Sequence, residues 1–398
     1  LPGRIRMSTV GPRRPILTLA LLVLAQVLGT SVWFAPVATE DLAHRLGTER
    51  MAPFIIATQA GFVIGTLVFA FSGLADRYPA SRVFAASAVL AAATNALLAV
   101  AGTVSEAVFY RLMTGMCLAG IYPFGMKLVV SWFPQRAPQA LGLLVGALVL
   151  GSASPWLMRA ATGTAGDASA VIPASSIAAL AAAMLVWACG DGPHVKRTGG
   201  FSWAGITGAL SNPNYRSALG GYLGHMAELY AFWALAPRLS AEAGFPGHGP
   251  TFGVMAMGAF GCVAGGLLAR SAGPGRVARW SLAASAACGL VWPWAAHGPD
   301  WFSMAVLMLW GLTVVSDSPQ FSALASAASP SDGVAAAMTL MVCLGFGLTI
   351  PTIDAMTRIE ATHGPWVGWA LAVGPIAGLA LMATGSGKAM PTSKPTNN

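Results

Sequence analysis

The sequence predicts an all-α polytopic membrane protein in which twelve transmembrane helices form two six-helix bundles. Hydrophobic residues make up 56% of the 398 residues and charged residues only 9%, whereas soluble domains carry about 25% charged residues. Apolar segments long enough to cross a bilayer recur along the whole chain. Lysine and arginine gather in alternate connections between these segments. The composition excludes a soluble enzyme, a disordered protein and a fibrous protein.

Twelve segments have the length and composition of a transmembrane helix, since a bilayer core of about 30 Å needs about 20 apolar residues. They are rich in Ala, Gly and Leu and lack the period-two alternation of barrel strands. The first is long enough to span and lacks a cleavable-signal ending, so we expect a retained helix. The segments cover residues 15–37, 52–75, 83–103, 106–132, 138–158, 169–189, 217–237, 250–270, 277–296, 301–327, 333–354 and 365–385.

The positions of Lys and Arg predict the orientation of the chain. With both termini inside, 15 of the 22 Lys and Arg residues fall on the inner side and five on the outer side, while Arg111 and Lys127 lie within the fourth segment. This bias follows the positive-inside rule for an even number of spans. The formal net charge of +8 is therefore explained by the excess of Lys and Arg on the inner side of the membrane, and it does not indicate a nucleic-acid partner. We expect a multi-pass protein of the cell (inner) membrane with both termini cytoplasmic.

The two halves of the chain resemble each other in the positions of Gly and Pro. A shift of 196 residues, close to half the chain length, places three such residues of the first half on the same residue type in the second. The pairs are Gly115 with Gly311, Pro123 with Pro319, and Pro134 with Pro330. Two six-helix halves related by a repeat are the architecture of a large class of secondary transporters.

The longest inner connection lies at the midpoint of the chain and is rich in Gly, Pro and basic residues. We therefore expect three parts. An N-terminal six-helix bundle covers residues 1–189, a cytoplasmic linker covers 190–216, and a C-terminal six-helix bundle covers 217–398. The two bundles would enclose a central cavity between them.

The connection after the second segment carries a motif. From Ser72 it reads SGLADRYPASR, which resembles the signature loop of the major facilitator superfamily, G-x-x-x-D-R/K-x-G-R/K-R/K, at its usual place between spans two and three. Asp76 and Arg77 match the pattern, and Arg82 falls near the closing basic pair. Ser72 and Pro79 replace the two glycines. The resemblance implies a fold of two six-helix bundles and secondary transport by alternating access.

The charged residues of this loop are candidates for a gate. Asp76, Arg77 and Arg82 could pair across the interface of the two halves in the outward-open state, and breaking those pairs would bias the equilibrium between states. The alternative is an ordinary positively charged inner loop. Arg111, followed by two glycines in the fourth segment, looks like the Arg-plus-glycine pattern of the family, which implies an anchoring role alongside the gate.

Two acids and a histidine lie near mid-membrane in the second half. Glu228 is in the seventh segment with His225 three residues earlier on nearly the same helix face, and Asp317 is in the tenth. Ionisable side chains in the hydrocarbon core are costly and usually face a cavity or a partner. Desolvation favours a neutral carboxyl group, and His titrates near neutral pH. These residues are therefore candidates for proton coupling. The alternatives are structural hydrogen bonds or a salt bridge of Asp317 with Lys127 or Arg111.

Polar and aromatic residues on several spans are candidates for substrate binding. The tenth span carries a polar stripe at spacings i, i+3, i+7 and i+10 from Trp310 to Gln320. Most polar residues in such helices simply satisfy a neighbour, which is the alternative for each. Lys127 either reaches the cavity or pairs with an acid. The candidates are Thr30, Trp33, Gln59, Tyr122, Lys127, Trp310, Thr313 and Gln320.

The expected energy source is an ion gradient, because the chain has no GxxxxGK[ST] loop and no soluble domain that could hydrolyse ATP. We expect a secondary active transporter that moves a small polar or anionic metabolite by alternating access, coupled to protons. A drug/proton antiporter is the first alternative, although the fifth segment lacks the Gly-Pro pair typical of those exporters. A transporter-like sensor and a membrane-embedded enzyme are remote alternatives. An enzyme would need a nucleophile–base pair with an orienting group, which the sequence does not suggest.

The expected partners are the small-molecule substrate, protons and the lipid bilayer, with the protein as a monomer. No enzyme activity, catalytic residue, metal or cofactor is expected. The five cysteines lie within apolar runs, widely spaced and without CxxC, which favours apolar filler over disulfides or a zinc site. The 17 methionines likewise favour core packing, although methionine ligands select Cu(I).

Overall fold

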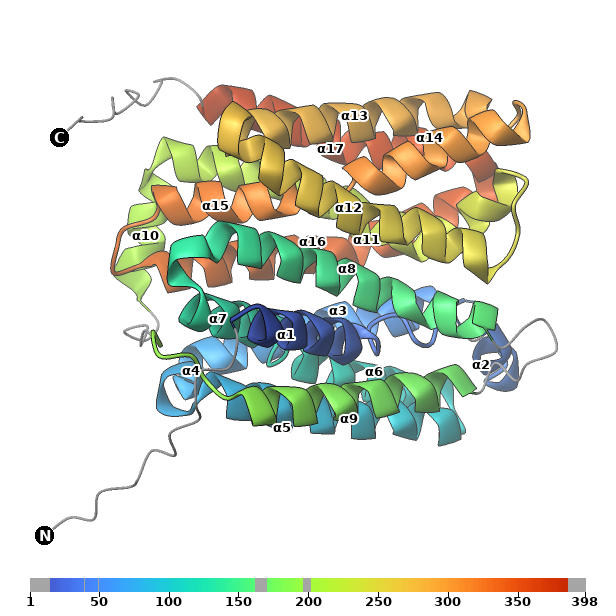
Figure 1. Cartoon of the computed structure of the whole chain (residues 1–398). Coiled ribbons are helices and arrows are strands. Elements are labelled where there is room, and N and C mark those ends of the chain that lie inside the picture. The colour runs from blue at the N-terminus through green and yellow to red at the C-terminus, as the bar shows by residue number, and fades with distance from the viewer. Residues whose placement is uncertain (1–14, 39, 49, 162–169, 196–201, 386–398) are drawn as a thin grey trace, which may run out of the picture.

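The computed structural model is a bundle of long helices that lie side by side (Figure 1). Every regular element in the described residues is a helix, as the composition predicts. The structure describes residues 15–38, 40–48, 50–161, 170–195 and 202–385.

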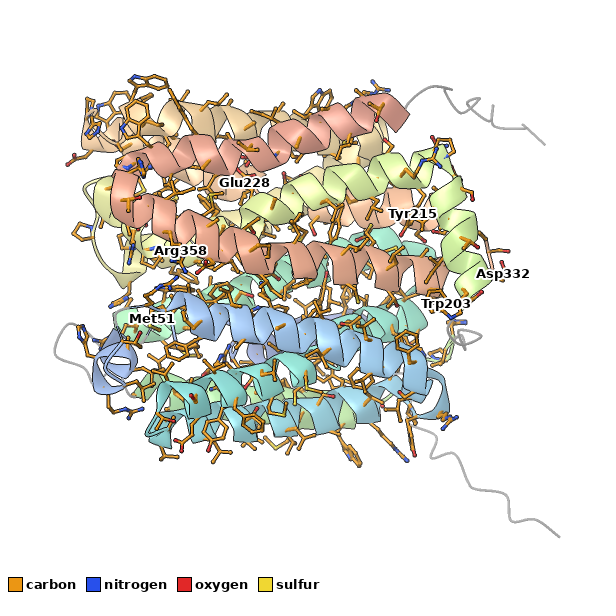
Figure 2. The ribbon with its side chains drawn as sticks, turned by 180° about the vertical axis from the view of Figure 1, so that it is seen from behind. Met51, Trp203, Tyr215, Glu228, Asp332 and Arg358 are labelled. Carbon is orange, nitrogen blue, oxygen red and sulfur yellow. The ribbon has the colours of Figure 1, made fainter. Side chains whose placement is uncertain are left out.

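Short helices distinguish the two ends of the bundle. The helix α2 (Glu40–Arg45) lies at one end, and α4 (Leu74–Arg77) and α10 (Trp203–Ser211) lie at the other. We name these the α2 end and the α10 end. Figure 2 shows Arg358 at the α2 end and Asp332 at the α10 end. The long helices run between these two ends.

The first half of the chain forms helices at the places of the first six expected spans. The fourth span is divided into α6 and α7, and the fifth follows a short 3₁₀ helix, η2. The bounds are Pro15–Thr30 for α1, Ala52–Ser72 for α3, Ala80–Leu97 for α5, Leu98–Val100 for η1, Val104–Leu118 for α6, Tyr122–Trp132 for α7, Pro134–Arg136 for η2, Ala137–Ala161 for α8 and Val171–Cys189 for α9.

The second half repeats this order after α10. The tenth span is divided into α14 and α15, and a short 3₁₀ helix, η4, separates the last two spans. The bounds are Pro213–Glu242 for α11, His248–Ala272 for α12, Pro274–Ala295 for α13, Asp300–Thr313 for α14, Ser318–Ala328 for α15, Val334–His363 for α16, Gly364–Trp366 for η4 and Val367–Gly385 for α17.

Eight stretches of the described residues are long and apolar enough to cross a membrane by length and composition. One of them, Val334–Thr384, joins α16 and α17 and so contains two expected spans. The helix α1 is apolar but shorter, and α11 and α13 are less apolar. In α11, His225 and Glu228 lower the hydropathy. A helix lies at each of the twelve places where the sequence predicts a span. That all twelve cross the membrane stays a prediction.

The first span differs from the prediction, because its helix ends at Thr30 instead of reaching residue 37. The hydroxyl groups of Thr30 and Ser31 donate to backbone carbonyls of their own turn, at 2.7 Å in each case. Residues 31–38 then form turns. Irregular backbone at membrane depth is tolerated where protein groups satisfy it, and the side chain of Arg111 does so here, as described below.

The fourth and tenth spans are each broken near the middle. Pro123 and Pro319 occupy the first turns of α7 and α15, where a missing backbone N–H costs least. The sequence predicts a single span at each place, with a bend at Pro123 and a break at Pro319 considered. The break in the tenth span divides the expected polar stripe, since Trp310 lies on α14, Gln320 on α15, and Asp317 between them.

The 196-residue repeat is visible in the positions where helices begin. Four helices of the first half have a counterpart that begins 196 residues later. The pairs of first residues are Ala52 and His248, Val104 and Asp300, Tyr122 and Ser318, and Val171 and Val367. Both broken spans belong to this set, so the halves share their irregularities as well as their helices.

Two helix pairs join the first half to the second along most of their length. The helix α8 packs on α12, and α3 packs on α16. Figure 1 shows α8 and α12 side by side across the middle of the bundle. The helices approach closely at Gly146, where an added Cβ atom would lie in ordinary van der Waals contact with Ala259 of α12.

Candidate functional site

Glu228 lies in a buried hydrogen-bond cluster in the second half, on α11 (Figure 2). The residue is 1% exposed. Its Oε2 accepts a hydrogen bond from the hydroxyl of Ser285 on α13 at 2.7 Å, and its Oε1 accepts one from Nε1 of Trp310 on α14 at 2.7 Å. Both donors are neutral groups. The cluster therefore satisfies the carboxyl oxygens without placing a fixed positive charge beside them.

His225 and Asp317 form a second buried contact one turn away. Nδ1 of His225 lies 2.8 Å from Oδ1 of Asp317, and both side chains are 1% exposed. The oxygen lies off the direction of a ring N–H bond, and within the described part of the chain these atoms have no aligned hydrogen-bond partner. The rings of Tyr222 and Phe321 flank the imidazole at 5.9 and 6.0 Å. The structure thus gives His225 and Glu228, which the sequence groups together, separate partners.

These two contacts place three titratable groups on neighbouring elements. Glu228 and His225 share a face of α11, and Asp317 lies in the break between α14 and α15. A buried ionisable group is stable only if it is paired or hydrogen-bonded. The arrangement keeps each of these three polar groups within reach of a neighbouring polar side chain.

Arg111 satisfies the irregular backbone that follows α1. Its Nε donates to Oγ1 of Thr58 at 3.0 Å, and its Nη1 donates to Oδ1 of Asn95 at 3.1 Å. Its Nη1 and Nη2 also donate to the carbonyl oxygens of Val32 at 3.0 Å and Trp33 at 2.5 Å. The guanidinium is fully buried, and all four acceptors are neutral groups of the first half. These contacts fit the anchoring role that the sequence predicts.

Seven aromatic side chains pack where the end of α1 meets the second half. Trp33 lies 5.8 Å from both Tyr230 and Phe346, between ring centroids, and Phe34 lies 5.9 Å from Trp233. None of the seven is more than 3% exposed. We name them the aromatic plug: Trp33, Phe34, Phe62, Trp156, Tyr230, Trp233 and Phe346. Rings from both halves therefore fill the space between the halves at the end of α1.

An ion pair connects the two halves at the α2 end, and two more lie beside it within the second half. Nη2 of Arg50, two residues before α3, lies 2.5 Å from Oδ1 of Asp354 on α16. Nε of Arg358 lies 2.8 Å from the other oxygen of Asp354. Arg238 pairs with Glu360 within the second half. The first pair joins the two halves outside the aromatic plug.

Most of the predicted substrate residues bond to other protein groups. Nε1 of Trp33 donates to Oε1 of Gln59 at 3.2 Å. The hydroxyls of Thr30 and Thr313 donate to carbonyls of their own helices at 2.7 and 2.9 Å, and Nε2 of Gln320 donates to a carbonyl of the preceding turn at 3.3 Å. The amide nitrogen of Gln59 is buried and has no partner among the described residues. Gln59 therefore retains a free donor.

The other predicted residues lie on α7 and around α4. Tyr122 and Lys127 are half-buried on α7. Arg77 and Arg82 are exposed at the α10 end. The side chain of Asp76 lies outside what the structure describes. The structure gathers the residues predicted for proton coupling, whereas Arg77 and Arg82 of the predicted gate lie exposed and Arg111 is buried.

Sequence reasoning missed Asp191 and most of the aromatic plug. Asp191 follows α9, and its carboxylate accepts hydrogen bonds from the backbone N–H groups of Ala80 and Ser81 at 2.9 and 2.7 Å. Acceptors at a helix start satisfy otherwise unpaired N–H groups, and here the contact ties α9 to α5. An acid directly after the sixth span was the available signal. For the aromatic plug, the available signal in the sequence was the adjacent pair Trp33 and Phe34, which follows the polar end of the first span.

A family model described as the Major Facilitator Superfamily matches residues 15–352. The chain belongs to this superfamily. The match covers all the elements from α1 into α16, so it includes both buried titratable contacts. Proteins of this superfamily are multi-pass membrane proteins, which agrees with the long apolar helices of this chain.

Two similar proteins give further context for the superfamily assignment. The crystal structure of the E. coli fucose:proton symporter FucP superposes with a TM-score of 0.64 at 14% identity, covering 94% of this chain and 100% of that one. At this identity the likeness concerns the fold. Solute carrier family 22 member 20 of Mus musculus is 34% identical over 90 residues, which is 22% of this chain and 16% of that protein. The chain thus matches only a small part of that relative.

Proposed function

We propose that the protein is a proton-coupled secondary transporter of a small polar or anionic metabolite, working by alternating access. The observation that carries this proposal is the buried carboxyl group of Glu228, which Ser285 and Trp310 hold and to which no cation of the described residues is hydrogen-bonded. A group in this setting exchanges a proton without stranding an opposite charge. The structural neighbour FucP is named as a fucose:proton symporter, which is consistent with coupling in this fold.

The closed α2 end supports alternating access. The aromatic plug and the pair between Arg50 and Asp354 join the halves on that side. For the solute to leave toward the α2 end, these contacts must separate while the α8–α12 and α3–α16 seams act as the axis of rocking. We infer that Asp76, Arg77 and Arg82 form the opposing gate at the α10 end.

The proposed substrate class rests on the polar groups beside the aromatic plug. Arg111 is committed to protein acceptors, whereas the amide nitrogen of Gln59 has no partner among the described residues and can donate to a solute. We also place Lys127 beside the path of the solute. Amide and indole donors suit hydroxyl, carbonyl or carboxylate oxygens. We therefore propose a small oxygen-rich metabolite and place Thr30, Trp33, Tyr122, Thr313 and Gln320 in the walls of its path.

The topology of the chain forms part of the proposal. We place the α10 end at the cytoplasm, because the Lys and Arg bias of the sequence assigns it there, and we place the protein in the inner membrane as a monomer. The N-terminal bundle covers residues 1–189 and the C-terminal bundle 217–398. The linker, 190–216, contains α10.

Proton flux into proteoliposomes tests the coupling. Vesicles that contain the purified protein and a trapped pH indicator receive sugars, polyols and organic acids in turn, without an imposed pH gradient. A symported solute acidifies the lumen, whereas an antiported one makes it alkaline, so the sign separates uptake from the drug/proton antiporter. Glu228→Gln is expected to abolish the proton flux while solute counterflow continues. Asp332→Asn removes an exposed acid and serves as the control.

The proposal fails if Glu228→Gln vesicles acidify as fast as wild type. Loss of counterflow together with proton flux would instead indicate that Glu228 binds the solute itself. A second substitution, Asp317→Asn, distinguishes the two contacts. If Glu228 carries the proton and the pair of His225 and Asp317 adjusts its accessibility, Asp317→Asn slows the flux without abolishing it.

A further inference from the structure

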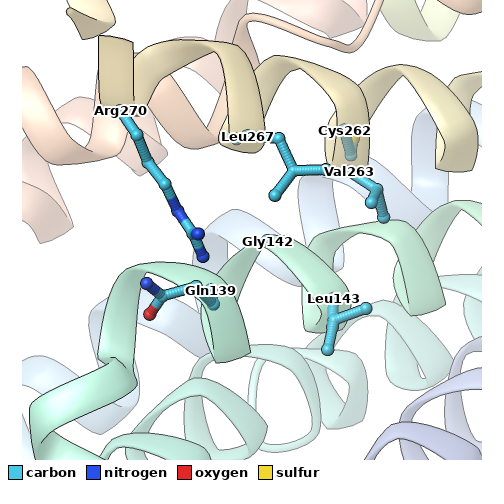
Figure 3. A pocket seen from close by; sticks show the side chains of 8 residues that line it. Gln139, Gly142, Leu143, Cys262, Val263, Leu267 and Arg270 are labelled. Carbon is cyan, nitrogen blue, oxygen red and sulfur yellow. The ribbon is translucent and has the colours of Figure 1, made fainter.

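A groove lies between α8 and α12 at the α10 end, away from the central cluster (Figure 3). It has a volume of about 300 Å³. Gly142 of α8 and Gly266 of α12 form its floor, because neither has a side chain to fill the space. A Cβ atom at Gly266 would meet no atom within 4 Å. The two glycines therefore leave part of the lining without side chains at the seam between the halves.

The walls of the groove are apolar and face outward from the bundle. Leu143 of α8 and Val263 and Leu267 of α12 line it, and these three side chains are 39, 38 and 55% exposed. The protein spans a membrane, so exposed leucine and valine on the outer surface of α8 and α12 meet lipid. The natural content of this groove is a hydrocarbon chain.

A single cation closes the groove at the α10 end. Figure 3 shows Arg270 of α12 extending toward Gln139 of α8. With its amide oriented to suit its neighbours, Gln139 donates to the carbonyl of Arg136 and accepts from Nη2 of Arg270, at 2.9 Å in both contacts. Gln139 thereby fixes the guanidinium at the mouth of the groove. A guanidinium has five N–H donors, and its fork matches the oxygens of a phosphate.

We propose that this groove binds a phospholipid with an anionic headgroup, taken from the leaflet at the α10 end. One acyl chain lies along Leu143 and Val263 over the glycine floor, and the phosphate group binds Arg270. Charge complementarity favours this occupant: the mouth of the groove is cationic, its walls are apolar, and basic residues near a membrane surface attract anionic lipid. The proposal concerns this seam alone and does not depend on the transported solute.

Native mass spectrometry of the purified protein tests the site, with phosphatidylglycerol and phosphatidylcholine of identical acyl chains as probes. Wild type is expected to retain one phosphatidylglycerol in preference to phosphatidylcholine. Arg270→Gln should weaken phosphatidylglycerol binding about fivefold, the effect of one basic residue near a membrane surface. Arg279→Gln removes an exposed cation from the same end outside the groove and should leave binding unchanged.

A second pair of variants tests the groove itself. Gly266→Leu fills the floor and should displace both lipids although Arg270 remains. Gly249→Leu, at the other end of α12, also meets no atom within 4 Å and should have no effect. Leu143→Trp fills the groove from the opposite wall and replaces Gly266→Leu if that variant does not fold. Equal losses in Arg270→Gln and Arg279→Gln, or lipid retained after the groove is filled, would overturn the proposal.

Discussion

Trp310 donates its indole N–H to Oε1 of Glu228 over 2.7 Å, from α14 to α11, and both residues are buried. Ser285 binds the second carboxyl oxygen, so each oxygen has one neutral donor. An indole stays neutral whether the acid is charged or protonated. A lysine or arginine in its place would be left unpaired, at high cost, whenever the acid took up a proton. The hydrogen bond from Trp310 is thus suited to an acid that repeatedly binds and releases a proton.

Replacing the indole should shift the pH dependence of transport. Trp310→Phe keeps an aromatic ring but removes a donor to the charged carboxylate, so the charged form is less stabilised and protonation persists to higher pH. A hydrogen bond to a charged group is worth about 1.5–3 kcal/mol, and one pH unit corresponds to about 1.4 kcal/mol. The pH at half-maximal solute-driven proton flux should rise by about one unit or more.

The matched control for this shift is Trp301→Phe. Trp301 lies at the start of the same helix and is 72% exposed, so its replacement should leave the profile unchanged. A lower maximal flux with an unchanged pH midpoint in Trp310→Phe would show that the indole only fills space and does not stabilise the charged acid.

Arg111 should contribute strongly to stability. Arg111→Met keeps much of the side-chain length but leaves four buried acceptors without their donor, including the carbonyls of Val32 and Trp33. Each buried unsatisfied group costs about 1–3 kcal/mol, so we expect the free energy of unfolding to fall by about 3 kcal/mol or more. Thermal unfolding in detergent measures this. Arg279→Met, an exposed control, should unfold near the wild-type temperature, and the same result for Arg111→Met would refute the anchoring role.

The fold could be predicted from the sequence because the hydropathy of a segment and the distribution of Lys and Arg can be read without knowing which residues come into contact. A helix stands at each expected place, and the superfamily suggested by the loop from Ser72 is the one that matches. The irregular points were harder to predict. The end of α1 at Thr30 depends on Arg111, 81 residues further along the chain, and no local pattern reveals such a distant donor.

The candidate site could be predicted by residue type but not by pairing. Ionisable residues at mid-membrane stand out because burying them is costly, and His225, Glu228 and Asp317 were found in this way. Their partners depend on how the helices pack. Sequence spacing grouped His225 with Glu228, and it left a salt bridge of Asp317 with Lys127 or Arg111 as an alternative to a role in proton coupling. The structure places Asp317 beside His225, and the donors of Arg111 face acceptors of the first half.

The pair between Arg50 and Asp354 should favour the closed α2 end. Exposed ion pairs are worth about 0.2–1 kcal/mol, so Asp354→Asn should raise the open fraction by no more than about fivefold. Spin labels at His44 and Ala361, both exposed at this end, report the opening as a longer distance in double electron–electron resonance. The difference from wild type should disappear in 1 M salt, which screens exposed charges.

Glu360→Gln provides the control for the ion pair. Glu360 pairs with Arg238 inside the second half, so its loss should not change the distance between the halves. An equal opening in Glu360→Gln would show that net charge at the α2 end, and not the bridge between the halves, sets the equilibrium. An opening in Asp354→Asn that persists in 1 M salt would exclude an electrostatic cause.

The internal repeat predicts that two glycines 196 residues apart respond alike to substitution. A Cβ atom at Gly115 would collide with the carbonyl oxygen of Thr58, and one at Gly311 would collide with that of Val254. Thr58 and Val254 are themselves 196 residues apart. In each half, therefore, the first helix of the broken span touches the backbone of a neighbouring helix. The pairs are α6 with α3 and α14 with α12, and glycine alone permits so close an approach.

Gly115→Ala and Gly311→Ala should each lower the free energy of unfolding by about 1–3 kcal/mol, because the added methyl group forces the paired helices apart. Gly347→Ala on α16 is the control, since its Cβ would meet no atom within 4 Å, and the higher helix propensity of alanine should stabilise it by up to about 1 kcal/mol. Thermal unfolding of the three variants in detergent gives the comparison. If Gly311→Ala behaved like Gly347→Ala while Gly115→Ala unfolded early, the two halves would share helix positions but not the close packing that the repeat implies.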